Sequence, residues 1–272
     1  ILLTIAYDGT NFSGWQRQPG QRTVQGELER VLSVLCCQEI TIAGTSRTDA
    51  GVHALGQRAT LRGSFGIPTD RIPLAANHLL AGNRGSGPAD VRILDAKEME
   101  AGFHARFNAT GKTYRYRILN WNEPDIFERN YACQIALPLD CEKMREALGA
   151  FVGKHDFAGF MAAGGTVPAT TVREIFDAKL LVKGDKEKVC GEGEGETCRE
   201  LMIEITGDGF LYNMVRIIAG TLMDAGSGRI DSKEIPAIIA GGDRSRAGHT
   251  APPQGLYLVR VIYEDEDKET RK

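Results

Sequence analysis

The chain has 272 residues, 42% hydrophobic and 25% charged, with a formal net charge of −3 and a pI near 6.0. This composition fits one large or two ordinary globular domains and excludes a fibre or a disordered chain. The small negative charge argues against a protein that binds nucleic acid by bulk charge alone. Since no apolar run approaches transmembrane length and no signal peptide is visible, we expect a cytoplasmic protein with no membrane association.

The first hundred residues predict one αβ unit. Alternating or β-branched runs indicate strands, and apolar residues every three or four positions indicate amphipathic helices. The predicted strands cover 1–7, 39–43, 55–61 and 90–96, and the predicted helices cover 23–36 and 70–80.

The second half repeats this order of elements, which suggests a pseudo-duplication. The predicted strands cover 113–119, 171–182, 200–206 and 256–263, and the predicted helices cover 140–151, 209–225 and 231–240. Asp140 is placed to cap its helix. The charged, glycine-rich segment 183–197 has no core pattern and is expected to be an exposed hairpin tip or a partly mobile insertion. We expect an N-terminal αβ domain over 1–103 and a C-terminal one over 104–272.

A loop over residues 44–54 separates the strands predicted at 39–43 and 55–61. Ala50 and Gly51 allow a tight turn directly after Asp49, which would present its carboxylate at the tip of a rigid sheet. A plain turn explains the same residue types. Spacing alone favours that second interpretation.

The loop also carries an unbroken eight-residue match to a known family. The segment from Arg47 to Ala54, Arg-Thr-Asp-Ala-Gly-Val-His-Ala, resembles the signature of the tRNA pseudouridine synthase A family, in which the Asp is catalytic. Further blocks resemble that family in the same order. They cover residues 3–16, 103–107, 112–116 and 209–216.

The resemblance implies a fold, a substrate and a partner. The expected fold is mixed α+β, with two pseudo-duplicated ferredoxin-like (RRM-like) halves whose largely antiparallel sheet is continuous, flanked by helices, and opens into a central active-site cleft. The substrate would be tRNA, at uridines of the anticodon stem-loop (tRNA positions 38–40), and no cofactor is expected. Family members are homodimers in which one tRNA contacts both subunits, so a basic cleft could form despite the negative chain.

Making pseudouridine requires a carboxylate that acts as a nucleophile or as a base at the sugar, and Asp49 is the predicted catalytic residue. Such a carboxylate needs a cation to offset its desolvation. Arg47 lies two residues earlier, on the same side of an extended segment. Arg216 is the only charge between residues 210 and 222, and the resemblance places it beside the Asp. Alternatively, Arg216 lies at the surface or pairs with another acid.

Two further side chains are predicted to contact the substrate. The resemblance places Tyr114 against the target base, where it could stack and help with the C5 proton, although a core aromatic is the alternative. Tyr116 points to the same strand face and could be confused with it. For His53 we expect only a structural or RNA-contact role.

Residues 101–117 hold four basic residues and no acid, so Arg106, Lys112 and Arg115 are predicted to contact phosphate. The alternative is a solvated strand face. A base turned out of an RNA stem would also gain from apolar neighbours, for which the candidates are Phe107, Val52 and Leu211.

The histidines show no metal-ligand spacing and the six cysteines form no CxxC pair, so we expect no metal site and free thiols, although Cys190 and Cys198 could face each other across a hairpin. The main competing hypothesis is a non-catalytic RNA-binding protein of the same fold. A more distant one is a metal-dependent hydrolase that uses Asp49 and His53.

Overall fold

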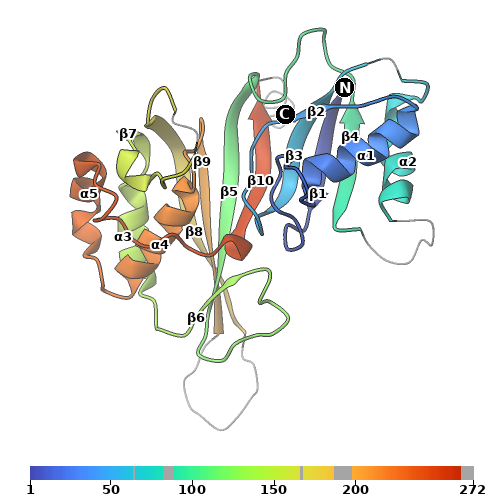
Figure 1. Cartoon of the computed structure of the whole chain (residues 1–272). Coiled ribbons are helices and arrows are strands. Elements are labelled where there is room, and N and C mark those ends of the chain that lie inside the picture. Colours follow the sequence, from blue (N-terminus) through green and yellow to red (C-terminus); the bar gives the residue numbers. More distant parts are fainter. Residues whose placement is uncertain (64, 82–88, 166–167, 187–197, 265–272) are drawn as a thin grey trace, which may run out of the picture. The chain divides into compact units, whose positions relative to one another are not determined.

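The computed structural model describes residues 1–63, 65–81, 89–165, 168–186 and 198–264. They form two compact units, Ile1–Thr110 with Tyr257–Lys272, and Gly111–Leu256 (Figure 1). The observed division differs from the expected one because the last strand returns to the first unit. No helix in the described ranges is long and apolar enough to cross a membrane.

The first unit is a sheet covered by two helices. Strand β3 is its centre, with β1 and β2 antiparallel to it, β10 parallel to it, and β4 antiparallel to β1. The elements are β1 (Leu2–Tyr7), α1 (Val24–Cys36), β2 (Ile42–Gly44), β3 (His53–Leu61), α2 (Ile72–Leu80), β4 (Val91–Lys97) and β10 (Leu256–Tyr263).

Both helices of this unit were predicted, and their ends have clear causes. The Thr23 side chain accepts a hydrogen bond from the Gly26 N–H and so caps α1. A short 3₁₀ turn, Thr69–Arg71, leads into α2, which carries a proline in its first turn. The buried face of α1 includes Val24, Leu28, Val31 and Leu32.

Strand β2 is shorter and lies later than predicted. The expected strand covered 39–43, but the Ile40 N–H donates to Ser33 Oγ at 2.9 Å and the Ile42 N–H donates to Glu29 Oε1 at 3.0 Å. These backbone groups are therefore satisfied by side chains of α1 and not by a neighbouring strand.

The second unit is an antiparallel sheet in the order β5-β9-β8-β7, with the short β6 parallel to β5. Helix α3 packs against α4 and β8. The sequence patterns missed β6 and β7 because strands of three or four residues are too short to show periodicity. The elements are β5 (Ala109–Asn120), β6 (Cys133–Ile135), α3 (Cys141–Gly149), β7 (Gly153–Asp156), β8 (Val172–Lys186), β9 (Cys198–Gly207), α4 (Met214–Gly226) and α5 (Ile235–Gly241).

The predicted cap of α3 is confirmed. Asp140 Oδ1 accepts the backbone N–H groups of Lys143 and Glu142, and these hydrogen bonds lower the pKa of the Asp140 carboxyl. Helix α4 begins at Met214 and not at residue 209, because Asn213 adopts a left-handed conformation with φ of 59°. Residues 209–213 are therefore non-helical and precede the helix.

Strands β8 and β9 form a hairpin paired as far as Lys186 and Cys198. The predicted tip at 183–197 lies outside the described residues from 187 onward, and so does the proposed approach of Cys190 to the Cys198 side chain. Among the described residues, Cys36, Cys37, Cys133 and Cys141 are free thiols, as expected.

The close packing of α4 gives a stability test with a matched control. A Cβ added at Gly220 would lie 1.9 Å from the carbonyl oxygen of His249, whereas one added at Gly149, the last residue of α3, would meet nothing within 4 Å. We expect Gly220→Ala to lower the free energy of unfolding by about 1–3 kcal/mol, because backbone must move.

Gly149→Ala is expected to raise the free energy of unfolding by about 0.5–1 kcal/mol, because the unfolded chain loses freedom. Urea unfolding measures both variants. Equal effects of the two substitutions would contradict the packing described for α4.

Candidate active site

The loop from Thr45 to Val52, between β2 and β3, is fixed first at Thr45. The Thr45 N–H donates to the Arg58 carbonyl at 2.9 Å, and its hydroxyl lies 3.0 Å from the carbonyl oxygen of Ala105. The hydroxyl of Tyr263, on β10, donates to the same Ala105 oxygen at 2.8 Å. The loop therefore starts from a buried junction of three chain segments.

Gln57 holds the next residue of the loop. Its side-chain oxygen accepts the Ser46 N–H at 3.2 Å, and its side-chain nitrogen donates to the Ser46 carbonyl at 2.8 Å. Gln57 is fully buried, so it replaces both hydrogen bonds that a neighbouring strand would make.

The segment after β1 holds the middle of the loop at Thr48. The hydroxyls of Tyr7 and Thr48 share a hydrogen bond of 2.7 Å, and the Trp15 N–H donates to the Thr48 carbonyl at 3.0 Å. Gly14 has φ of +90°, and a Cβ there would lie 2.7 Å from the Thr48 carbonyl oxygen. Glycine is thus required where the two segments meet.

Asp49 follows at the turn itself. Its carbonyl accepts the Val52 N–H at 3.2 Å, and Gly51 within the turn has φ of +77°. Arg47 is exposed and Asp49 half-buried, whereas Thr48 between them is buried. This alternation agrees with the extended geometry from which we expected Arg47 and Asp49 to share a side.

His53 is the first residue of β3 and is only 2% exposed. Its Nδ1 accepts the Gly9 N–H at 3.1 Å, and its ring stacks on Tyr257 with centroids 4.7 Å apart. Nδ1 also lies 3.3 Å from Asp8 Oδ1. The contact with Asp8 is an ion pair only when the imidazole is protonated. This burial favours a structural role for His53 over contact with RNA.

The two tyrosines of β5 differ in burial and in the contacts of their side chains. Tyr116 is fully buried, its hydroxyl donates to the Pro252 carbonyl at 2.8 Å, and burial raises its pKa. Tyr114 is 8% exposed and meets the ring of Phe210 edge-on at 5.2 Å. Of the pair, Tyr114 is therefore the better candidate for substrate contact.

Arg216 lies in the first turn of α4 with its guanidinium held on two sides. Its Nε donates to the Ala251 carbonyl at 2.7 Å, and its Nη1 donates to Asn213 Oδ1 at 2.8 Å. The Ala251 N–H returns a hydrogen bond to the Arg216 carbonyl at 3.1 Å. A half-buried cation is thereby fixed in one orientation.

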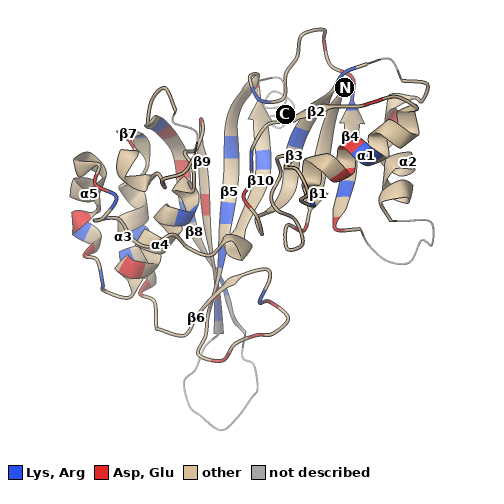
Figure 2. Cartoon of the chain, viewed as in Figure 1, with Lys and Arg blue, Asp and Glu red and all other residues tan. Residues whose placement is uncertain are grey.

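Two arginines of β5 pair with acids on β9, and Figure 2 colours the basic and acidic residues of these strands. Arg115 pairs with Glu204 through contacts of 2.7 and 2.5 Å, and Arg117 pairs with Glu200 at 2.8 Å. Cross-strand pairing of this kind favours the solvated-face alternative for Arg115. Lys112 is half-buried, and Arg106 is exposed.

The predicted residues fall in both units. The first unit holds Arg47, Asp49, His53 and Arg106, and the second holds Lys112, Tyr114, Arg115 and Arg216. Of the candidates for contact with a displaced base, Val52 and Leu211 are buried, whereas Phe107 is 76% exposed. Sequence reasoning missed Gln57 and Tyr263, because a polar residue in an alternating strand gives no sign of its partner.

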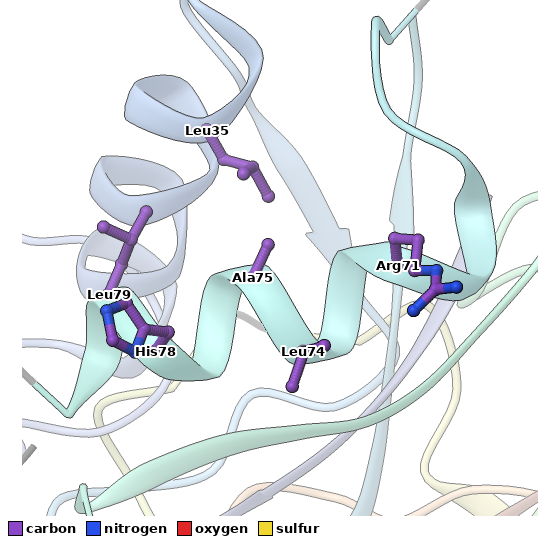
Figure 3. Close-up of a pocket in the computed structure, with 6 residues that line it drawn as sticks. All are labelled: Leu35, Arg71, Leu74, Ala75, His78 and Leu79. Atoms are coloured by element: carbon purple, nitrogen blue, oxygen red, sulfur yellow. The ribbon is translucent and has the colours of Figure 1, made fainter.

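A cavity of about 470 Å³ in the first unit contains none of the predicted residues. It lies between α1 and α2 (Figure 3), and its walls are mainly apolar. Within the described ranges no group of three or more His, Cys, Asp or Glu side chains could hold a metal ion. The lining residues are Leu35, Arg71, Leu74, Ala75, His78 and Leu79.

Comparison with known proteins gives one consistent family. The family model described as tRNA pseudouridine synthase matches residues 3–108 and 147–264. The chain is 45% identical to tRNA pseudouridine synthase A of Ruminiclostridium cellulolyticum over 263 residues, which cover 97% of this chain and 99% of that protein. It is 44% identical over 267 residues to the protein of the same name in Bacillus pumilus, with the same coverage.

The contact between Tyr7 and Thr48 can be tested by a double-mutant cycle. We expect Tyr7→Phe and Thr48→Val each to lower the free energy of unfolding by about 1 kcal/mol, because each leaves a buried hydroxyl without this partner. The double variant is expected to lose less than the sum, with a coupling of about 0.5–1.5 kcal/mol. Urea unfolding of the four proteins supplies the cycle, and strict additivity would show that the hydrogen bond contributes nothing.

Proposed function

Because the chain belongs to the tRNA pseudouridine synthase family, we propose that it is an isomerase that converts uridine to pseudouridine in the anticodon stem-loop of tRNA. The observation that carries the proposal is the segment from Arg47 to Ala54. Its half-buried carboxylate, Asp49, lies on a turn whose neighbours are fixed by buried hydrogen bonds.

We further infer that the two halves of the chain derive from one repeated βαββαβ pattern of the ferredoxin-like type. In the first unit, β1-α1-β2-β3-α2-β4 has β3 antiparallel to both β1 and β2, and β4 antiparallel to β1. In chain order, β5-α3-β8-β9-α4-β10 corresponds, with β9 antiparallel to both β5 and β8. A continuous sheet with a central active-site cleft belongs to this proposal.

The reaction assigns a specific task to Asp49. The bond between N1 and C1′ of the uridine breaks, a bond between C5 and C1′ forms, C5 then loses its proton, and N1 gains one. No electron or atom comes from a second substrate, so the carboxylate can act as the nucleophile or as the base that starts the reaction. The buried contacts of Thr48 and Ser46 keep the backbone beside Asp49 in place for this step.

The remaining predicted residues bind and orient in this proposal. Arg216 supplies the positive charge that keeps a desolvated carboxylate ionised, and its hydrogen bonds to Ala251 and Asn213 fix the direction of its guanidinium. Arg47, exposed two residues before Asp49, contacts the RNA. Tyr114 stacks on the target base. Lys112 and Arg106 contact phosphate, whereas Arg115 remains paired with Glu204.

The proposed enzyme works in the cytoplasm as a homodimer in which one tRNA contacts both subunits. Its tRNA substrate is supported by the names of the similar proteins. A positively charged surface completed by a second copy would explain how a chain of net charge −3 binds a polyanion.

Asp49→Asn tests the proposal directly. With unmodified tRNA containing C5-tritiated uridine, we expect the parent protein to release tritium and Asp49→Asn to release it at least about 10²-fold more slowly, because the essential carboxylate is gone. Asp95→Asn, an exposed position on β4, is the matched control and should keep full activity.

Binding of tRNA is measured in parallel, and both assays are run with and without a chelator. Equal release by the parent and Asp49→Asn would exclude Asp49 as the catalytic carboxylate. Binding without release by either protein would favour the non-catalytic RNA-binding protein, and loss of parent activity through chelation would favour the metal-dependent alternative.

Salt dependence separates Arg106 from Arg115. A plot of the logarithm of the tRNA binding constant against the logarithm of salt concentration has a negative slope. We expect Arg106→Gln to make this slope less steep by about 1, because one phosphate contact and its released counterion are lost. The double variant Arg115→Gln/Glu204→Gln removes an ion pair without changing net charge and should leave the slope unchanged. Fluorescence anisotropy with labelled tRNA measures both, and a reversed result would make Arg115 the phosphate contact.

A further inference from the structure

A short turn after β4 displays an aromatic ring to solvent. Phe107 is 76% exposed, its ring centroid lies 4.4 Å from that of His104, and the guanidinium carbon of Arg106 lies 5.7 Å from it. Single exposed apolar side chains are common on proteins. Here, however, two rings and a cation gather on one turn of four residues.

The turn is rigid because its polar groups bond to one another. The backbone N–H of Phe107 donates to the His104 carbonyl at 3.1 Å, and that of Arg106 donates to His104 Nδ1 at 3.1 Å. The His104 N–H in turn donates to Asn108 Oδ1 at 2.8 Å. The exposed ring is thus displayed from a fixed backbone.

The same turn is anchored to the loop that carries Asp49. Ala105, between His104 and Arg106, is fully buried, and its carbonyl is the atom that meets the hydroxyls of Thr45 and Tyr263. Thr45 begins the catalytic loop. The position of Phe107 is therefore coupled to the position of the loop through one buried oxygen atom.

We propose that Phe107, flanked by His104 and Arg106, is a stacking platform for one unpaired base of the tRNA. The inference rests on the proposed function, since it takes the substrate to be RNA. Unpaired bases stack on aromatic rings and on arginine guanidinium planes. The exposed neighbours Arg106, Asn108 and Arg62 are polar or basic, and Arg62 reaches the Phe103 carbonyl at 3.5 Å. These neighbours suit a nucleic acid better than the apolar face of a protein.

The experiment measures tRNA affinity without requiring turnover. Dissociation constants for labelled, unmodified tRNA are measured by fluorescence anisotropy at several salt concentrations for the parent protein, Phe107→Ala and Phe107→Trp. Phe127→Ala is the matched control, because Phe127 is 80% exposed in the second unit. Thermal unfolding and sedimentation of each variant check folding and oligomeric state.

Phe107→Ala is expected to raise the dissociation constant about tenfold without changing its salt slope, because one base loses its stacking partner. Phe107→Trp should bind within about twofold of the parent, since a larger ring stacks equally well. Phe127→Ala should bind like the parent.

Unchanged affinity of Phe107→Ala would overturn the proposal, as would an equal loss in Phe127→Ala. A changed oligomeric state with unchanged affinity would assign Phe107 to a contact between copies of the chain and would also overturn it. The proposed isomerisation is tested separately. If the parent protein binds tRNA through Phe107 but releases no tritium, the proposed reaction is wrong and the proposed stacking platform still stands.

Discussion

A polar loop can be buried beside a sheet only if its backbone groups find partners, and this constraint organises the first unit. Gln57 satisfies Ser46, Tyr7 and Trp15 satisfy Thr48, and the Ala105 carbonyl meets Thr45. Each partner comes from a different part of the chain. Any rearrangement of the loop would leave buried polar groups without hydrogen bonds and is therefore unfavourable. The hydrogen bonds of its neighbours thus hold Asp49 in place.

The second unit fixes its candidate residues by the same means. The left-handed Asn213 directly precedes α4 and its side chain accepts a hydrogen bond from Arg216, which also donates to the Ala251 carbonyl. Pro252, next in the chain, accepts the hydroxyl of the buried Tyr116. Backbone carbonyls of one short segment thus position an arginine and a strand tyrosine together, so both depend on the path of that segment.

Much of this fold could be predicted, because periodicity and caps are local. Thr23 and Asp140 cap their helices as expected. The shift of β2 could not be predicted, because side chains of α1 take its backbone N–H groups. At the site, the signature segment identified Asp49 through resemblance. The pairing of Arg115 with Glu204 depends on the register of β5 against β9. The two residues lie 89 positions apart in the sequence, so no local pattern predicts their contact.

The junction at the Ala105 carbonyl has a consequence for synthesis of the protein. Thr45 and Tyr263 meet there across 218 residues, and β10 pairs with the start of β3 through Tyr257 and His53. The first unit consequently remains incomplete while the ribosome makes the whole second unit. The ribosome makes the loop from Thr45 to Val52 long before it makes β10, the strand that fixes this loop. The loop therefore acquires its final geometry only late in translation.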